Sequence, residues 1–171
     1  MRLSIIIPVF NEVDTISDII QKVKNSDYDK EIIVVDDAST DGTKDVLQKL
    51  SQQPEINIFY HEKNCGKGAA IRTAIKNITG NITIIQDADL EYDPVDYTIL
   101  LKPILDGRAD VVYGSRFQGG SQSTCYLCGH QQEQRLLLRL QQCFFSLCSQ
   151  DGRNNPQILK VLIIQRLRVF L

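Results

Sequence analysis

The apolar residues of the first 115 positions fall into two alternating patterns. Short runs such as Leu3–Val9 are almost continuously apolar, which is typical of strands buried on both faces of a sheet. Other stretches, such as 14–24, repeat their apolar residues at helical spacing behind an aspartate cap. Together the patterns predict strands over 3–9, 31–36, 56–61, 81–86 and 110–115, and helices over 14–24, 43–52, 67–78 and 95–105.

This alternation predicts an α/β fold, with a mostly parallel sheet and helices on both of its faces. Asp93 and Pro94 look like the cap and first-turn proline of the last helix, which Pro103 is expected to bend. In such a sheet, the residues that follow the strands meet at one edge, where α/β proteins bind their ligands. We therefore look for the chemistry of this chain at the ends of its predicted strands.

Composition divides the chain near residue 120. Residues 1–118 contain 13 basic and 19 acidic residues, whereas residues 119–171 contain 6 and 2, together with four of the five cysteines. A single domain accounts for the length, because a chain of 171 residues buries roughly 70% of its unfolded surface. We assign 1–120 to a core domain and 121–171 to an atypical tail whose structure the sequence leaves undetermined.

The chain lacks the patterns of secretion and membrane insertion. A proline interrupts the first apolar run too early for a signal peptide. The apolar stretch 158–171 is broken by Lys160, Gln165, Arg166 and Arg168, well short of the ~20 apolar residues that a spanning helix needs. With Cys65 alone in the first 118 residues, a disulfide framework is not expected. These features predict a cytoplasmic protein.

Alternating acidic residues follow the strand predicted over 81–86. Asp87, Asp89 and Glu91 offer the hard oxygen ligands that Mg²⁺ or Mn²⁺ prefers, and these ions usually share coordination with a substrate's phosphates. The alternative is an ordinary acidic turn that caps the next helix. Because Asp93 is available as that cap, we favour the metal site.

A second acidic pair, Asp36 and Asp37, follows another predicted strand. A carboxylate at this position can accept hydrogen bonds from a nucleobase or a ribose. The neighbouring Ser39, Asp41 and Gly42 are typical of turns and caps. We therefore predict a functional role for Asp37 and a structural role for Asp41.

Two further loops are candidates for the same crevice. The segment 64–68 precedes a helix, where backbone amides and Lys67 can meet phosphate, although its spacing is not that of a nucleoside-triphosphate hydrolase loop. Gly68 is equally well explained by close helix packing. The segment 8–12 follows the first strand, so its side chains are expected to face the same crevice as Asp37.

Taken in order, these motifs resemble those of the family 2 glycosyltransferases, which have the GT-A fold. Within that family they are most similar to enzymes that transfer a hexose to a polyprenyl phosphate such as dolichyl phosphate. The resemblance is specific for the family and less specific for the sugar. The matching segments are 5–12 (IIIPVFNE), 35–43 (VDDASTDGT), 64–69 (NCGKGA), 87–94 (DADLEYDP) and 114–117 (GSRF).

The resemblance implies an inverting, metal-dependent enzyme that uses Mg²⁺ or Mn²⁺. Its donor would be a nucleotide-diphosphate sugar, GDP-mannose or UDP-glucose, and its acceptor a polyprenyl phosphate, which is anionic near neutral pH and needs no general base. Asp87, Asp89 and Arg116 are then the expected catalytic residues, with Arg116 reaching toward phosphate. The metal would be held by Asp87, Asp89 and Glu91. The expected donor-binding residues are Pro8, Phe10, Asn11, Glu12, Val35, Asp37, Lys67 and Ala88.

Beyond Gly120 the resemblance ends. The abrupt change in charge, cysteine and glutamine usage indicates a truncated, alternatively spliced or frame-shifted end to the catalytic core. Two other interpretations stay open: peripheral contact with an anionic membrane surface, and a four-thiolate zinc site. The residues concerned are the arginines Arg135, Arg139, Arg166 and Arg168 and the cysteines Cys125, Cys128, Cys143 and Cys148.

Two alternatives to an active transferase also stay open. A donor-binding fragment would hold the nucleotide sugar without transferring it. A receiver-like phosphoacceptor domain would explain Asp36 and Asp37, but in that fold the acidic pair follows the first strand, and here it follows the second. None of these readings includes a nucleic-acid partner.

Overall fold

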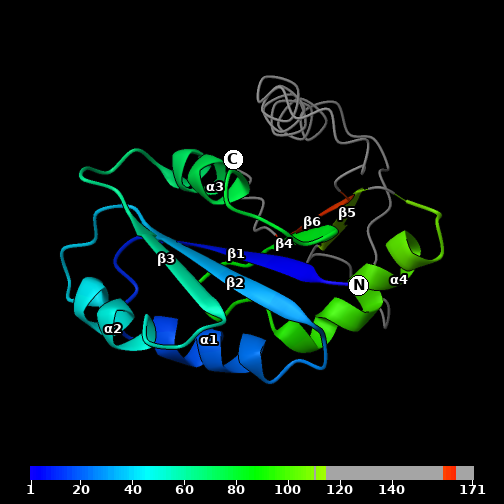
Figure 1. Cartoon of the computed structure of the whole chain (residues 1–171), viewed down its shortest axis with the longest axis horizontal. Coiled ribbons are helices and arrows are strands. Elements are labelled where there is room, and N and C mark those ends of the chain that lie inside the picture. Colours follow the sequence, from blue (N-terminus) through cyan, green and yellow to red (C-terminus); the bar gives the residue numbers. More distant parts are fainter. Residues whose placement is uncertain (110, 115–159, 165–171) are drawn as a thin grey trace, which may run out of the picture.

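The computed structural model describes residues 1–109, 111–114 and 160–164, whose strands form one sheet. The elements are β1 (Leu3–Val9), α1 (Ile16–Lys24), β2 (Lys30–Asp36), α2 (Thr43–Leu50), β3 (Ile56–Tyr60), α3 (Lys67–Ile75), β4 (Ile82–Ile85), the 3-10 helix η1 (Pro94–Asp96), α4 (Tyr97–Leu105), β5 (Val111–Gly114) and β6 (Lys160–Ile164). The strand order is β3-β2-β1-β4-β6-β5, and every neighbouring pair is parallel. Helices α1, α2 and α4 cover one face, and α3 covers the other (Figure 1). The predicted α/β architecture is confirmed.

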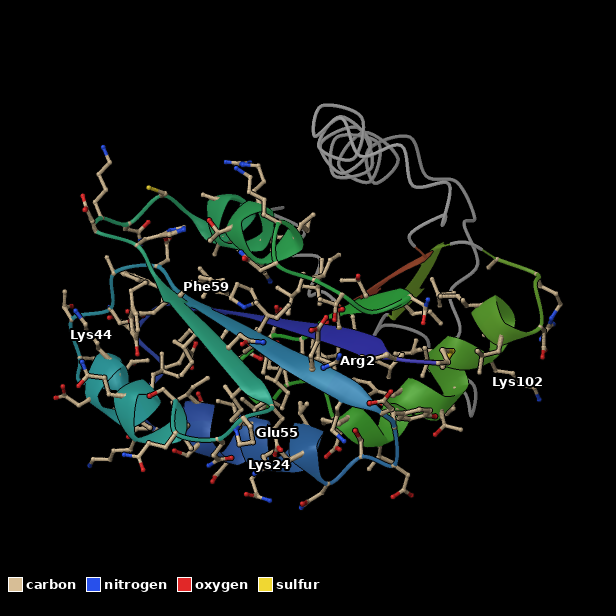
Figure 2. All side chains as sticks on the ribbon, in the orientation of Figure 1. Arg2, Lys24, Lys44, Glu55, Phe59 and Lys102 are labelled. Carbon is tan, nitrogen blue, oxygen red and sulfur yellow. The ribbon has the colours of Figure 1, made fainter. Side chains whose placement is uncertain are left out.

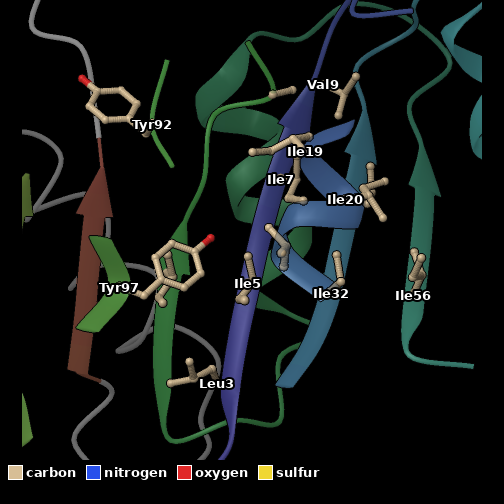
Figure 3. Packing of buried hydrophobic residues seen from close by; sticks show 14 of the residues in the cluster. Leu3, Ile5, Ile7, Val9, Ile19, Ile20, Ile32, Ile56, Tyr92 and Tyr97 are labelled. Atoms are coloured by element: carbon tan, nitrogen blue, oxygen red, sulfur yellow. The ribbon is translucent and has the colours of Figure 1, made fainter. Parts of the chain in front are cut away.

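Side chains of the central strands alternate between two hydrophobic clusters, one on each face of the sheet. On β1, Leu3, Ile5 and Ile7 belong to the cluster beneath α1, α2 and α4 (Figure 3). Ile6 belongs to the cluster beneath α3. Because both faces are covered, both sets of side chains must be apolar, and this explains why the strands read as continuous apolar runs.

The predicted boundaries of the helices and strands lie within three residues of the observed ones. Of the two predicted helix caps, one is wrong and one is confirmed. The aspartate cap proposed for α1 is wrong: the N-cap is Thr15, whose hydroxyl donates to the Glu12 carboxylate instead of capping the helix (2.6 Å). The cap proposed at Asp93 is confirmed, because its side chain accepts from the Val95 amide (3.1 Å) and a proline opens η1. Pro103 lies inside α4.

One piece of the predicted tail belongs to the sheet. Strand β6 lies between β4 and β5 and pairs with both. The sequence leaves the structure of 121–171 undetermined, and the structure gives a strand over Lys160–Ile164. The tail cysteines Cys125, Cys128, Cys143 and Cys148 and the arginines Arg135, Arg139, Arg166 and Arg168 lie outside the described residues. No helix in the described part is long and apolar enough to cross a membrane.

A buried carboxylate joins three segments at the amino-terminal end of the sheet. Glu31, only 3% exposed, accepts hydrogen bonds from the Ser4 hydroxyl (2.5 Å), from the Thr79 amide and hydroxyl (2.5 and 2.8 Å) and from the Gly80 amide (3.1 Å). Burial alone would raise the pKa of Glu31, but these hydrogen bonds hold it below its ordinary value. The guanidinium of Arg2, labelled in Figure 2, lies 3.9 Å from the Glu31 carboxylate. Glu31 therefore fastens the turn before β4 to β1 and β2.

Candidate functional site

The loops that follow β1, β2 and β4 meet at the carboxyl-terminal edge of the sheet. Strand β1 has β2 on one side and β4 on the other, so the chain leaves it in opposite directions, and a crevice opens at such a point. A cavity of about 300 Å³ lies there. Eight of the predicted site residues line it: Pro8, Phe10, Glu12, Asp37, Lys67, Asp87, Ala88 and Asp89.

Three other predicted site residues, Asn11, Val35 and Glu91, are not among the residues that line the cavity. The Val35 side chain is fully buried in the cluster beneath α3, so donor binding by Val35 stays a prediction that its side chain does not support. Asn11 has a φ of 55°, and its side chain accepts a backbone hydrogen bond from the loop after β2 (2.8 Å), so it shapes that loop. The Glu91 amide donates to the Asp89 carboxylate (3.1 Å). Arg116 lies outside the described residues.

Asp87 is a buried carboxylate that faces a lysine. It is 9% exposed, and its Oδ1 lies 2.5 Å from Nζ of Lys67, the first residue of α3. Burial raises the pKa of the Asp87 carboxyl; the Lys67 ammonium opposes this rise, and the charges of Asp89 and Glu91 add to it. Three acidic groups thus lie near one another, and their carboxylate oxygens are ligands that suit a further cation.

A buried amide that the sequence analysis missed holds the acidic loop in place. The Gln86 Nε2 donates to the backbone carbonyls of Asp87 (3.1 Å) and Tyr92 (3.0 Å), while its Oε1 accepts from the Tyr97 hydroxyl (2.8 Å). Gln86 is fully buried, and Tyr97 is too. The available signal was a polar residue at the end of an apolar strand. Gln86 ties the loop to α4 and so positions the carboxylates that follow it.

Asp37 is the most heavily bonded carboxylate of the site. It accepts from His61 Nδ1 (2.6 Å), from the Cys65 amide (3.0 and 3.2 Å to its two oxygens) and from the Gly66 amide (2.6 Å). Gly66 has a φ of +85°, a backbone conformation that favours glycine. Burial would raise the pKa of Asp37, but these donors together lower it. Asp37 is therefore an ionised group that also holds the turn before α3.

Asp37, His61 and Cys65 are the one group of three possible metal ligands within 4.8 Å of one another in the described part of the chain. Two atoms bound to one zinc ion at about 2 Å each lie roughly 3.3 Å apart in tetrahedral geometry. The separation of 2.6 Å between His61 Nδ1 and Asp37 Oδ1 is that of a hydrogen bond. We therefore treat this group as a hydrogen-bond network.

Asp41 and Gly68 belong to the loops and helix around the site, and each has a predicted structural role. Asp41 accepts from the amide and the hydroxyl of Thr43 (3.0 and 2.6 Å) and from the Val13 amide (3.1 Å), which is the turn-forming arrangement expected of it. A Cβ on Gly68 would lie 3.7 Å from the Arg72 side chain, an ordinary contact. Close packing therefore does not require glycine at position 68.

Two known proteins are similar in sequence to about two thirds of this chain. A dolichol-phosphate mannosyltransferase of Pyrococcus furiosus is 31% identical over 122 residues, which are 70% of this chain and 34% of that protein. A UDP-N-acetylglucosamine–dolichyl-phosphate N-acetylglucosaminyltransferase of Methanococcus voltae is 30% identical over 67% of this chain and 51% of its own. The chain thus spans a third to a half of the length of these relatives.

A solved structure has the same fold. The mannosyltransferase PcManGT from Pyrobaculum calidifontis, in complex with GDP-Man and Mn²⁺, matches with a TM-score of 0.51 and 30% identity over 56% of this chain and 30% of that one. The model of the family described as Glycosyl transferase family 2 matches residues 4–132, most of the chain. The chain therefore belongs to glycosyl transferase family 2 and has the GT-A fold of its members.

Proposed function

We propose that this chain is the donor-binding part of an inverting hexosyltransferase that moves a sugar from a nucleotide-diphosphate donor to a polyprenyl phosphate. The observation that carries the proposal is the cavity at the edge of the sheet, where Asp37 lies on one side of β1 and Asp87 and Asp89 lie on the other. One end of this cavity suits a nucleoside and the other suits a diphosphate. The family assignment supports the same reaction class.

The nucleoside end combines an aromatic ring with a carboxylate. Phe10 lines the cavity and is 46% exposed, which leaves its ring free to stack on a base. Asp37 is ionised and can accept a hydrogen bond from a base or ribose N–H or O–H group. Pro8 and Glu12 complete the wall on the β1 side. This end would bind and orient the nucleoside.

The diphosphate end carries both signs of charge. Lys67 stands at the start of α3 and can transfer its contact from Asp87 to a phosphate oxygen, with the amino end of the helix behind it. Asp87 and Asp89 fit Mg²⁺ or Mn²⁺, since both carboxylates line the cavity, where the Lys67 ammonium forms an ion pair with Asp87. A bound divalent cation would stabilise the negative charge that develops on the diphosphate leaving group.

The acceptor is the part of the proposal that depends most on relatives. Two relatives are named for transfer to dolichol or dolichyl phosphate, and they differ in the sugar they carry. A phosphate monoester is anionic near neutral pH, so it can attack the anomeric carbon without a general base. Arg116 would meet its phosphate, and a peripheral position at a cytoplasmic membrane surface would bring the lipid within reach. GDP-mannose and UDP-glucose are the two donors to test.

Calorimetric titration of UDP, GDP and their sugar conjugates, with and without Mn²⁺, tests the donor site. We expect one nucleotide to bind more tightly when Mn²⁺ is present. Asp89→Asn should remove most of the gain from Mn²⁺, whereas Asp18→Asn, on the exposed side of α1, should change nothing. Absence of binding by the folded wild-type chain would refute the proposed donor site.

A second candidate function is donor binding without transfer. It is favoured by one observation, that the chain covers 34% and 51% of the lengths of the two curated relatives. Incubation of the chain with the donor that binds and with dolichyl phosphate separates the two candidates. Formation of a glycosyl phospholipid would establish transfer, whereas unchanged lipid beside measurable donor affinity would establish the binding fragment.

A further inference from the structure

We propose that His61 is a positioning residue for Asp37, that Thr73 holds it in place, and that this three-residue network sets the affinity for the donor nucleotide. The proposal rests on the donor site described above, because it takes Asp37 to be the carboxylate that meets the nucleoside. It adds to that site two residues that lie outside its cavity lining and in none of the sequence motifs.

The network joins three elements through both nitrogens of one imidazole ring. His61 Nδ1 lies 2.6 Å from Asp37 Oδ1, at the end of β2, and His61 Nε2 lies 2.8 Å from the Thr73 hydroxyl, within α3. His61 itself follows β3, and its amide donates to the Asp36 carbonyl (2.9 Å). The side chains of His61 and Asp37 are 15% and 3% exposed. The ring is thus held between the sheet and the helix.

The partners of the ring determine where its proton lies. An ionised carboxylate only accepts hydrogen bonds, so Nδ1 next to Asp37 must carry the proton. A hydroxyl can donate or accept, so Thr73 donates to Nε2 of the neutral ring and accepts from Nε2 of the charged ring. The ring orientation is therefore the same in both protonation states. Thr73 fixes the direction from which His61 meets Asp37.

The remaining donors to Asp37 complete the contacts around its two oxygens. A carboxylate has about four acceptor positions. Two contacts reach each oxygen: His61 and the Cys65 amide at Oδ1, and the Cys65 and Gly66 amides at Oδ2. Asp37 lines the cavity at the edge of the sheet, whereas His61, Cys65 and Thr73 line a separate hollow. Donors thus engage both oxygens of Asp37 and fix the orientation in which this carboxylate meets the cavity.

A matched pair of substitutions separates positioning from stability. The amide nitrogen of asparagine falls near the place of Nδ1, and that of glutamine near the place of Nε2. His61→Asn therefore keeps a donor to Asp37, and His61→Gln keeps a partner for Thr73 alone. Both remove the ring, so their unfolding midpoints should fall by similar amounts. Glu62→Gln, at the exposed neighbouring position, is the surface control.

The test is the affinity for UDP and GDP, measured by calorimetry without metal and again with Mn²⁺. His61→Asn should bind within about threefold of wild type, and His61→Gln should bind about tenfold or more weakly, because it leaves an acceptor of Asp37 unfilled. The factor gained on adding Mn²⁺ should be the same in both. Thr73→Val should weaken binding less than His61→Gln, and Thr73→Ser should restore it.

Each outcome decides one of the two proposals. A wild-type chain that binds no nucleotide overturns the donor site, and the positioning role with it. A wild-type chain that binds nucleotide overturns only the positioning role if His61→Asn and His61→Gln weaken binding equally. The same holds if the loss of affinity in every variant follows its loss of thermal stability.

Discussion

The substitution Glu31→Gln tests how much an ionised carboxylate contributes at the end of the sheet opposite the site. It keeps the shape of the side chain and removes the charge from a group that accepts four hydrogen bonds. A hydrogen bond to a charged group contributes about 1.5–3 kcal/mol to stability, and one between neutral groups contributes about 0.5–1.5 kcal/mol. Removing the charge should therefore reduce the contribution of each hydrogen bond by about 1 kcal/mol at most. We expect the free energy of unfolding to fall by about 2–4 kcal/mol.

The dependence of this loss on pH makes the test specific. Because the pKa of Glu31 is lowered in the folded state, the folded protein binds this proton less readily than the unfolded chain does. Its stabilisation is complete above the ordinary pKa of a glutamic acid and is lost as the pH falls through the lowered, folded value. Urea denaturation of wild type and variant from neutral to acidic pH should therefore show two stabilities that converge.

A surface glutamate provides the control. Glu55 pairs with Lys24 at 3.0 Å, and its side chain is 44% exposed (Figure 2). Removal of such an exposed pair costs about 0.2–1 kcal/mol. The reasoning is refuted if Glu31→Gln costs no more than Glu55→Gln, or if its cost stays constant as the pH falls.

Three further substitutions have expected results that thermal or chemical denaturation can check. Gly80→Ala would place a Cβ 2.6 Å from the Ser4 hydroxyl and 2.8 Å from its backbone nitrogen, so it should destabilise by about 1–3 kcal/mol; an unchanged midpoint would contradict this contact. Thr83→Val should stabilise by about 1 kcal/mol, since the buried Thr83 hydroxyl has no partner among the described residues; destabilisation would mean that the hydroxyl is bonded. Asp41→Asn should lower the free energy of unfolding by about 1 kcal/mol at neutral pH, because it weakens two hydrogen bonds from Thr43. Desolvation would raise the pKa of Asp41, but the hydrogen bonds hold it below its ordinary value. The cost of the substitution should therefore vanish at acidic pH, where Asp41 is protonated.

The sequence predicted the fold well because both faces of the sheet are covered. Strands buried on two sides have to be apolar at nearly every position, and this signal is local. Helix ends were less predictable, since Thr15 rather than Asp14 begins α1 through contacts with the preceding loop. Strand β6 could not be predicted, because its pairing with β4 and β5 depends on partners far away in the chain.

The acidic residues of the site could be predicted because their position after apolar strands is visible in the sequence. Eight of the expected residues line one cavity. The contributions of His61 and Thr73 were not visible, since each acts through a hydrogen bond to a residue of another element. Asp37→Ala would affect the fold as well as the site, because Asp37 binds the turn before α3.

The position of β6 has a consequence for folding of the protein during its synthesis on the ribosome. Strand β5 pairs with β6, so neither β5 nor the outer edge of β4 has its neighbour until residues 160–164 have been synthesised. An unpaired strand edge is a template for another chain. Parallel pairing across so long a stretch of sequence is also intrinsically slow. During synthesis, the nascent chain therefore contains an incomplete sheet whose exposed strand edge can pair with other chains and aggregate. A chaperone that covers the edge of β4 would act before β6 is synthesised.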